Sequence, residues 1–163
     1  ELERLNIKTI LLPNITLHET VDVLNVESNF NTSIIHPIKI TLNQLKKKEI
    51  KEVVLFGSFY SMQGTYILEQ FKAKSIKVSL PKENEMKFID DFRQDIYQYK
   101  ERPNDLIKYQ QLLQLYSKNQ SVVIACTELS LVLETIPTNV YDMSRLQLKE
   151  ALETRNKTVG NST

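Results

Sequence analysis

Residues 121–128 read SVVIACTE and residues 52–58 read EVVLFGS, and these two stretches indicate the fold class. Each contains a run of β-branched and other apolar residues without alternating polar positions, and each ends in small or polar residues. A third stretch, IKTILLPN at residues 7–14, has a similar form. Continuous apolar runs of this length are typical of strands buried on both faces of a parallel sheet.

Segments with helical spacing of apolar residues lie between these runs. Helices are predicted over residues 16–26 with Thr16 as the cap, over 61–73 starting at Ser61, and over 83–99. Two further helices are predicted to start at an Asn104 cap and at a Ser144 cap. Weaker strand candidates are SIKVSLP at 75–81 and PTNVYDM at 137–143. Since strands that alternate with helices form right-handed βαβ units, the sequence predicts an α/β fold with parallel sheets flanked by helices.

Polar residues follow three predicted strands, at the points where strands give way to helices. These turns are PNIT at 13–16, GSFYS at 57–61 and ACTE at 125–128. Ligands of parallel sheets bind beyond the carboxyl ends of the strands, and free N–H groups at helix starts suit an anion such as a carboxylate. We therefore expect the three turns to converge on one anion-binding pocket.

Composition argues against several classes of function. The 163 residues include 21 Lys and Arg against 20 Asp and Glu, so the net charge of +1 gives no reason to expect a nucleic acid or an anionic membrane as partner. One Cys excludes an intramolecular disulfide and a Cys-cluster zinc site, and two His make a His-based metal cage improbable. No apolar run reaches the ~20 residues of a membrane span. The charged start ELERLN predicts no signal peptide, and we expect a cytoplasmic protein.

Cys126 is the residue best suited to carry chemistry. A thiol at the start of a helix is expected to have a lowered pKa, because the helix dipole and free N–H groups favour the thiolate. The alternative is a small buried hydrophobic residue. His18 is either positioned to orient or protonate a ligand or is an ordinary structural His. The polar residues of the turns can also be explained as caps or turn formers: Asn14, Thr16, Ser58, Ser61 and Thr127.

Four motifs resemble the aspartate/glutamate racemase superfamily. ACTEL at 125–129 is similar to its Gly-Cys-Thr-Glu-Ile box, and GSFYSM at 57–62 is similar to its Gly-Thr-x-x-Thr-Met turn. PNITLH at 13–18 partly resembles Pro-Cys-Asn-Thr-Ala-His around the first catalytic Cys, and VYDM at 140–143 resembles the closing Phe-Asp-Thr segment. The four motifs occur in the order of the family over nearly the whole chain.

The resemblance implies a two-lobed α/β enzyme that needs no cofactor and no metal. In that family two Cys thiols face opposite sides of the substrate α-carbon, where one removes a proton and the other returns one. Cys126 would be one acid/base on a small acidic amino acid, and His18 and Glu128 would be orienting residues. The residues expected to hold carboxylates are Thr16, Ser58, Ser61 and Thr127.

The chain departs from the family pattern in three places. Asn14 stands where the family has its first Cys, or Pro13 does if one residue is inserted, and Gln147 replaces a His of the closing segment. A neutral amide cannot exchange protons at pH 7. The chain also begins where the family is about a third complete. Three functions therefore remain open: a racemase or isomerase, a relative that binds a dicarboxylate or a protein partner without turnover, and one-Cys chemistry of the decarboxylase type.

The resemblance also divides the chain into lobes. Residues 1–45 and 136–155 would form an incomplete first lobe, residues 46–135 the second lobe, and residues 156–163 a flexible tail. Because an incomplete lobe exposes a sheet edge, we expect a homodimer or association with a missing N-terminal segment.

Overall fold

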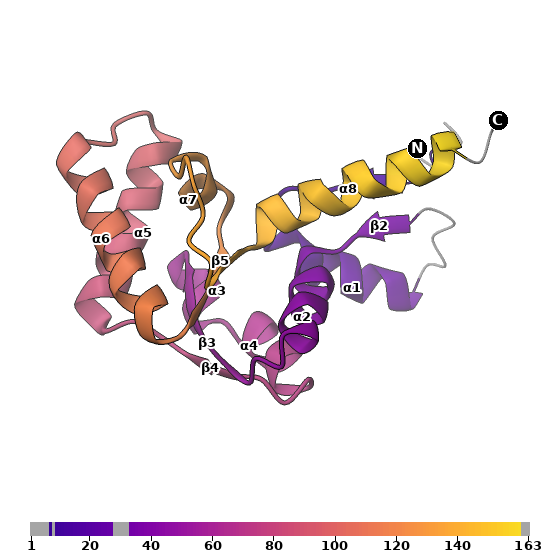
Figure 1. Cartoon of the computed structure of the whole chain (residues 1–163), viewed down its shortest axis with the longest axis horizontal. Helices are drawn as coiled ribbons and strands as arrows, with labels where there is room; N and C mark the ends of the chain where they lie inside the picture. The colour runs from indigo at the N-terminus through magenta and orange to yellow at the C-terminus, as the bar shows by residue number, and fades with distance from the viewer. Residues whose placement is uncertain (1–6, 8, 28–32, 161–163) are drawn as a thin grey trace.

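Two parallel sheets form the framework of the protein in a computed structural model that describes residues 7, 9–27 and 33–160 (Figure 1). The larger sheet has the order β4-β3-β5-β6, with β3 at Glu52–Gly57, β4 at Lys77–Ser79, β5 at Ser121–Ala125 and β6 at Val140–Asp142. The smaller sheet pairs β1 at Thr9–Leu11 with β2 at Ser33–Ile35. All four pairings are parallel.

Eight helices connect or flank these strands in the described part of the chain. They are α1 at Leu17–Glu27, α2 at Pro37–Lys47, α3 at Phe59–Gln63, α4 at Thr65–Lys72, α5 at Glu83–Tyr97, α6 at Pro103–Asn119, α7 at Thr127–Leu131 and α8 at Met143–Gly160. The predicted α/β fold, with parallel sheets flanked by helices, is confirmed. None of the helices in the described residues combines the length and the apolar character needed to cross a bilayer.

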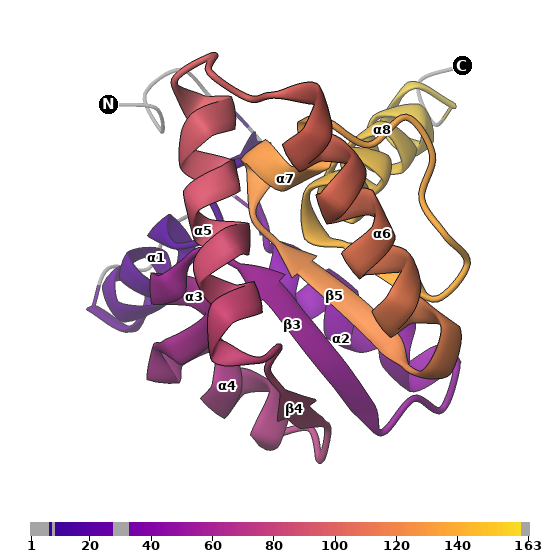
Figure 2. The same ribbon diagram turned by 90° about the vertical axis from the view of Figure 1, so that its left-hand side faces the viewer.

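The central strands are buried on both faces, as their continuous apolar runs predict. Val54 and Phe56 of β3 pack in one apolar cluster with residues of α5, α6 and α7. Val53 and Leu55 point to the opposite face, into a cluster with residues of α2 and α4. Figure 2 shows β3 and β5 between α5 and α6 on the near side and α2 on the far side.

One predicted helix, at 61–73, is two short helices in the structure. Ser58, not Ser61, is the N-cap of α3, and its hydroxyl oxygen accepts a hydrogen bond from the Ser61 N–H at 3.1 Å. Gly64 lies between α3 and α4 in extended backbone, which turns the chain before the second helix. Helix α3 therefore begins directly after β3, and α4 follows after the turn at Gly64.

The caps of three other helices also differ from the prediction. Asn14 rather than Thr16 caps α1, since its Oδ1 accepts from the Leu17 N–H at 3.2 Å. Arg102 precedes α6, with Pro103 as its first residue, so Asn104 lies inside the helix. Asp142 rather than Ser144 supports the start of α8, because its Oδ1 accepts from the Ser144 N–H at 2.9 Å.

The sequence pattern did not reveal β2 and α2. A strand of three residues is too short to show a period, and the Pro37 that follows it is the first residue of α2. His36 is the N-cap of α2, where its Nδ1 accepts from the Lys39 N–H at 3.5 Å. The two elements complete the small β1–β2 unit.

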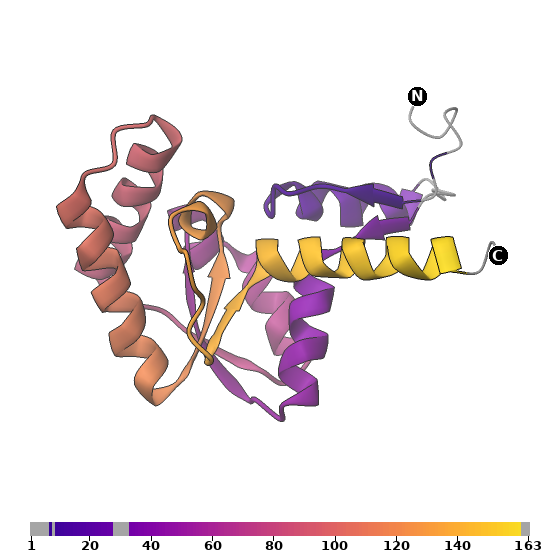
Figure 3. The same cartoon turned by 45° about the horizontal axis from the view of Figure 1, so that its top comes forward.

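Helix α8 connects the two sheets. It starts directly after β6 of the larger sheet and contacts β1, β2 and α2 along its length (Figure 3). β1, β2 and α1 thus lie with α8 at one end of the molecule, away from α5 and α6 (Figures 1 and 3). Residues 156–160 belong to α8, and the remaining predicted tail, 161–163, lies outside the described residues.

Candidate functional site

The three strand-end turns meet in one cavity of about 300 Å³, as expected from their places in the sheets. Its lining consists of Pro13, Asn14, Ile15, Thr16, Ser58, Ser61, Arg93, Ala125, Cys126, Thr127 and Glu128. We call this cavity the Cys126 pocket. Of the eight site residues predicted from the sequence, seven line it, and His18 does not.

The register between β3 and β5 brings two of the turns together. Gly57 is paired with Ala125 at the ends of these strands, so the residues that follow, Ser58 and Cys126, lie at the same edge of the sheet. A Cβ atom at Gly57 would lie 3.0 Å from the Cβ of Ser61 and 3.2 Å from the carbonyl oxygen of Ala125. Glycine therefore allows α3 to start close against the end of β5.

Residues 13–16 form the wall that faces the other two turns. Asn14 Oδ1 accepts hydrogen bonds from the Thr16 hydroxyl at 2.8 Å and from the Leu17 N–H at 3.2 Å. The Thr127 hydroxyl donates to the carbonyl oxygen of Pro13 at 2.6 Å, which links this wall to the start of α7. Asn14 is thus held in place as a helix cap at the start of α1.

The thiol of Cys126 is buried, with 6% of the residue exposed, and Sγ lies 3.0 Å from Glu128 Oε2. Burial raises the pKa of the thiol well above its usual range, and the hydrogen bond to the Glu128 carboxylate raises it further. The predicted lowering of this pKa is therefore wrong. Backbone N–H groups of Glu128 and Leu129 do favour the thiolate, but α7 has only five residues, and their effect is smaller than the loss of hydration.

Arg93 is the cationic side chain among the described residues that line the pocket, and no motif in the sequence pointed to it. It lies on α5, where its Nε donates to Asp90 Oδ1 at 2.9 Å. Asp90 is itself held by the Phe59 N–H at 3.1 Å and by Gln94 Nε2 at 2.8 Å. The only signal in the sequence was an Asp and an Arg three residues apart on a predicted helix, which is common on solvated helix faces.

Ionisable groups are distributed unevenly around the pocket. Among the described residues that line it, Arg93, Cys126 and Glu128 are ionisable, whereas the wall of residues 13–16 carries no ionisable side chain. Across residues 7, 9–27 and 33–160, no three His, Cys, Asp or Glu side chains are grouped so that they could hold a metal ion. The pocket therefore combines one thiol, one guanidinium, one carboxylate and several hydroxyl groups among the described residues that line it.

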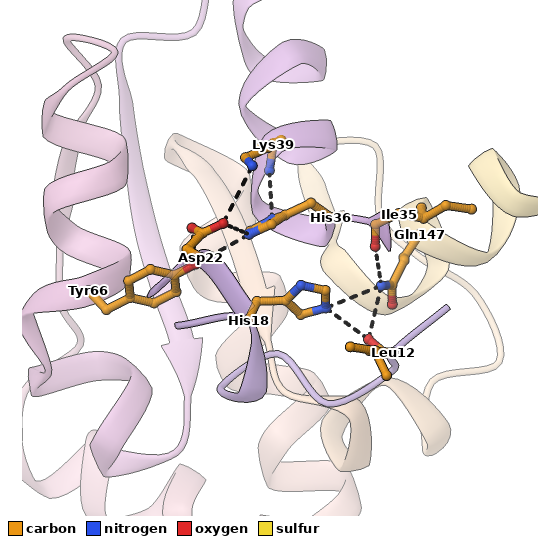
Figure 4. A network of polar contacts seen from close by, with 8 residues as sticks. All are labelled: Leu12, His18, Asp22, Ile35, His36, Lys39, Tyr66 and Gln147. Atoms are coloured by element: carbon orange, nitrogen blue, oxygen red, sulfur yellow. Dashed lines mark hydrogen bonds and ion pairs between the residues drawn. The ribbon is translucent and has the colours of Figure 1, made fainter. Parts of the chain in front are cut away.

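His18 lies beneath the wall of residues 13–16 instead of facing the pocket. Its side chain is fully buried, and Nε2 lies 3.0 Å from the carbonyl oxygen of Leu12 (Figure 4). Gln147 Nε2 donates to the same carbonyl at 2.9 Å and to that of Ile35 at 2.6 Å. The two side chains thus fix the ends of β1 and β2 just before the pocket wall begins, so His18 can influence a ligand only through the backbone.

A second group of polar side chains continues from His18 (Figure 4). The rings of His18 and His36 lie 4.5 Å apart between centroids, and His36 Nε2 is 3.4 Å from Asp22 Oδ1. The Tyr66 hydroxyl donates to Asp22 Oδ2 at 2.7 Å, which joins α4 to α1. Burial lowers the pKa of His36 to about 4, so this His is neutral at pH 7.

Comparison with known proteins gives matches only among solved structures. No family model matches the chain, and no curated protein does. An aspartate racemase homologue from Pyrococcus horikoshii superposes with a TM-score of 0.76 at 19% identity, and the match covers 94% of this chain and 69% of the homologue's chain. A protein assigned as an Asp/Glu racemase from Yersinia pestis superposes with a TM-score of 0.78 at 17% identity, and the match covers 94% of this chain and 68% of the Yersinia chain.

A third solved structure agrees with these two. The aspartate racemase of Picrophilus torridus superposes with a TM-score of 0.62 at 18% identity, covering 87% of this chain and 59% of its own. At these identities the likeness establishes the fold, and the resemblance first seen in the sequence motifs is confirmed at that level. The chain has the α/β fold of aspartate/glutamate racemase homologues.

Proposed function

We propose that the Cys126 pocket binds a small acidic amino acid and that Cys126 transfers a proton at its α-carbon, the chemistry of a cofactor-independent amino-acid racemase. The observation that carries this proposal is the meeting of a thiol, a guanidinium and several hydroxyls in one cavity. The names of the fold neighbours support the same class of reaction and substrate.

Arg93 would bind a carboxylate of the substrate. Its hydrogen bond to Asp90 engages Nε, and a guanidinium fork can present its terminal amino groups to a carboxylate. The Ser58 and Ser61 hydroxyls lie 3.0 Å apart on the lining, and because their mutual hydrogen bond uses one of their two O–H groups, the other is a further donor. The Thr16 hydroxyl already donates to Asn14 Oδ1 at 2.8 Å, so it would have to leave that acceptor to bind a carboxylate. Donors at a carboxylate also stabilise the enediolate-like state that forms when the α-proton leaves.

Glu128 would supply the acid/base partner of the thiol. At neutral pH the raised pKa keeps Cys126 as a thiol. Transfer of the thiol proton to the Glu128 carboxylate, across 3.0 Å, leaves a thiolate that can remove the α-proton; the reverse transfer restores both groups. The thiol form is itself the proton donor for the return step.

The opposite face of the substrate would meet the wall of residues 13–16. Because no ionisable side chain lies there among the described residues, proton exchange on the Cys126 face is the step that the pocket supports best. This feature and the raised pKa of the thiol also favour a second candidate function, the binding of a dicarboxylate without turnover.

Exchange of the α-proton in D₂O tests the proposal. L- and D-aspartate and glutamate would be followed by NMR and chiral chromatography, with Cys126→Ala as the matched variant. We expect exchange that depends on Cys126, chiefly with retention. Exchange with inversion would reveal a second acid and a true racemase.

Other outcomes separate the remaining readings. If the folded protein shows no exchange but is thermally stabilised by aspartate or succinate, in both the wild type and Cys126→Ala, it binds without turnover. If it shows neither exchange nor stabilisation, the proposed function is wrong.

A further inference from the structure

A second cavity adjoins the Cys126 pocket, between the starts of α1, α3 and α4. It has a volume of about 170 Å³, and its lining consists of Thr16, Glu19, Tyr60, Ser61, Gly64, Thr65, Tyr66 and Ile67. Thr16 and Ser61 line both cavities, so the two spaces share one border. We call the second cavity the Glu19 pocket.

The two cavities differ in their charged residues. Among the described residues that line it, the Cys126 pocket has one cation, Arg93, and one carboxylate, Glu128, which already accepts from the Cys126 thiol. Arg93 lines the Cys126 pocket and not the Glu19 pocket, whereas Glu19 lines the Glu19 pocket and not the Cys126 pocket. A zwitterionic ligand placed across the shared border would have its negative end near a cation and its positive end near an anion. Such charge complementarity fixes the orientation of a ligand more than it adds affinity.

A hydrogen bond from Tyr60 holds the Glu19 carboxylate in place. The Tyr60 hydroxyl donates to Glu19 Oε2 at 2.6 Å, and this hydrogen bond raises the pKa of Tyr60, so the hydroxyl remains a donor. The contact joins the first turn of α1 to α3 and engages one of the two carboxylate oxygens.

The Cys126 pocket lacks a comparable partner for an ammonium group. Its one lining carboxylate among the described residues is Glu128, which already accepts from the Cys126 thiol at 3.0 Å. An ammonium drawn to Glu128 would also lie in the pocket that holds Arg93. We propose that Glu19 binds the α-ammonium group of the acidic amino acid and thereby distinguishes amino acids from plain dicarboxylates; this rests on the proposed function.

Calorimetric binding of L-aspartate and succinate tests the role of Glu19, because succinate is the same dicarboxylate without the ammonium group. In Glu19→Gln we expect the affinity for L-aspartate to fall about tenfold or more, as for loss of a charged hydrogen bond, with succinate affinity within about twofold of the wild type. Glu69→Gln, on the exposed face of α4, is the matched control and should leave both affinities unchanged.

Tyr60→Phe is a second variant on an exposed side chain, and it keeps the test valid if Glu19→Gln does not fold. It should weaken L-aspartate binding severalfold and leave succinate binding unchanged, since it releases the carboxylate without removing it. Equal weakening of both ligands, or no change for either in a folded variant, would overturn the role of Glu19 and leave the proposed function standing. Failure of the wild type to bind either ligand would overturn both.

Discussion

Replacing Gln147 by Met should destabilise the protein and loosen the wall of the Cys126 pocket. Gln147 is 1% exposed, and its amide donates to the carbonyl oxygens of Leu12 and Ile35 at 2.9 and 2.6 Å. Met has a similar length and no donor, so it preserves most of the packing and removes both hydrogen bonds. The two carbonyls belong to the end of β2 and to the residue that follows β1.

The expected cost follows from what each carbonyl retains. The Leu12 carbonyl oxygen still has His18 Nε2 as a partner at 3.0 Å. Losing the Gln147 hydrogen bond there should therefore cost about 1 kcal/mol, the net contribution of one hydrogen bond. Ile35 loses the Gln147 donor in a buried place, which costs about 1–3 kcal/mol. Because Met buries less polar surface than Gln, part of the cost of the two lost hydrogen bonds is offset. We expect a net decrease of about 2–3 kcal/mol in the free energy of unfolding. For a chain of this size that lowers Tm by about 4–12 °C.

Urea and thermal unfolding at pH 7 measure this decrease, and Gln110→Met is the control. Gln110 is exposed on α6, so its replacement should change the free energy of unfolding by less than about 0.5 kcal/mol. Since Leu12 precedes Pro13, succinate binding should weaken in Gln147→Met and not in the control. If Gln147→Met melts within about 2 °C of the wild type, the two hydrogen bonds contribute no net stability and the reasoning is refuted.

Three other predictions concern charge. Arg93→Met should abolish the thermal stabilisation by succinate, while Arg93→Lys should retain part of it; full stabilisation of Arg93→Met would remove Arg93 from the ligand site. Alkylation of Cys126 by iodoacetamide at pH 7.5 should be slower than that of a free thiol. Glu128→Gln should accelerate the alkylation, because loss of the carboxylate lowers the thiol pKa, and an unchanged rate would contradict this expectation. Between pH 6.5 and about 4, His36 binds a proton in the unfolded chain but not in the folded protein, where it is buried. The free energy of unfolding should therefore fall by about 3 kcal/mol as the pH is lowered through this window. Burial also lowers the pKa of His18, which acts in the same direction. Urea unfolding at pH 7 and pH 4.5 measures the fall, and an equally steep fall in His36→Gln would assign it to other groups.

The sequence by itself determined the central sheet and the places of the polar turns. The runs at 52–58 and 121–128 are continuous and apolar because β3 and β5 are covered on both faces, and that requirement is visible residue by residue. The ends of parallel strands lie at one edge of a sheet, so strand order alone was enough to expect that the turns holding Ser58 and Cys126 would share a pocket.

Tertiary structure decided which groups act together in that pocket. Arg93 reaches it only because α5 packs over the ends of the strands, and His18 leaves it because α1 turns that side chain toward Gln147, 129 residues away. The pKa of Cys126 depends on how much water the surrounding helices exclude, which no local pattern records. Burial, charge pairing and hydration are properties of segments brought together from distant parts of the chain, and for that reason the chemistry of the thiol had to be taken from the folded protein.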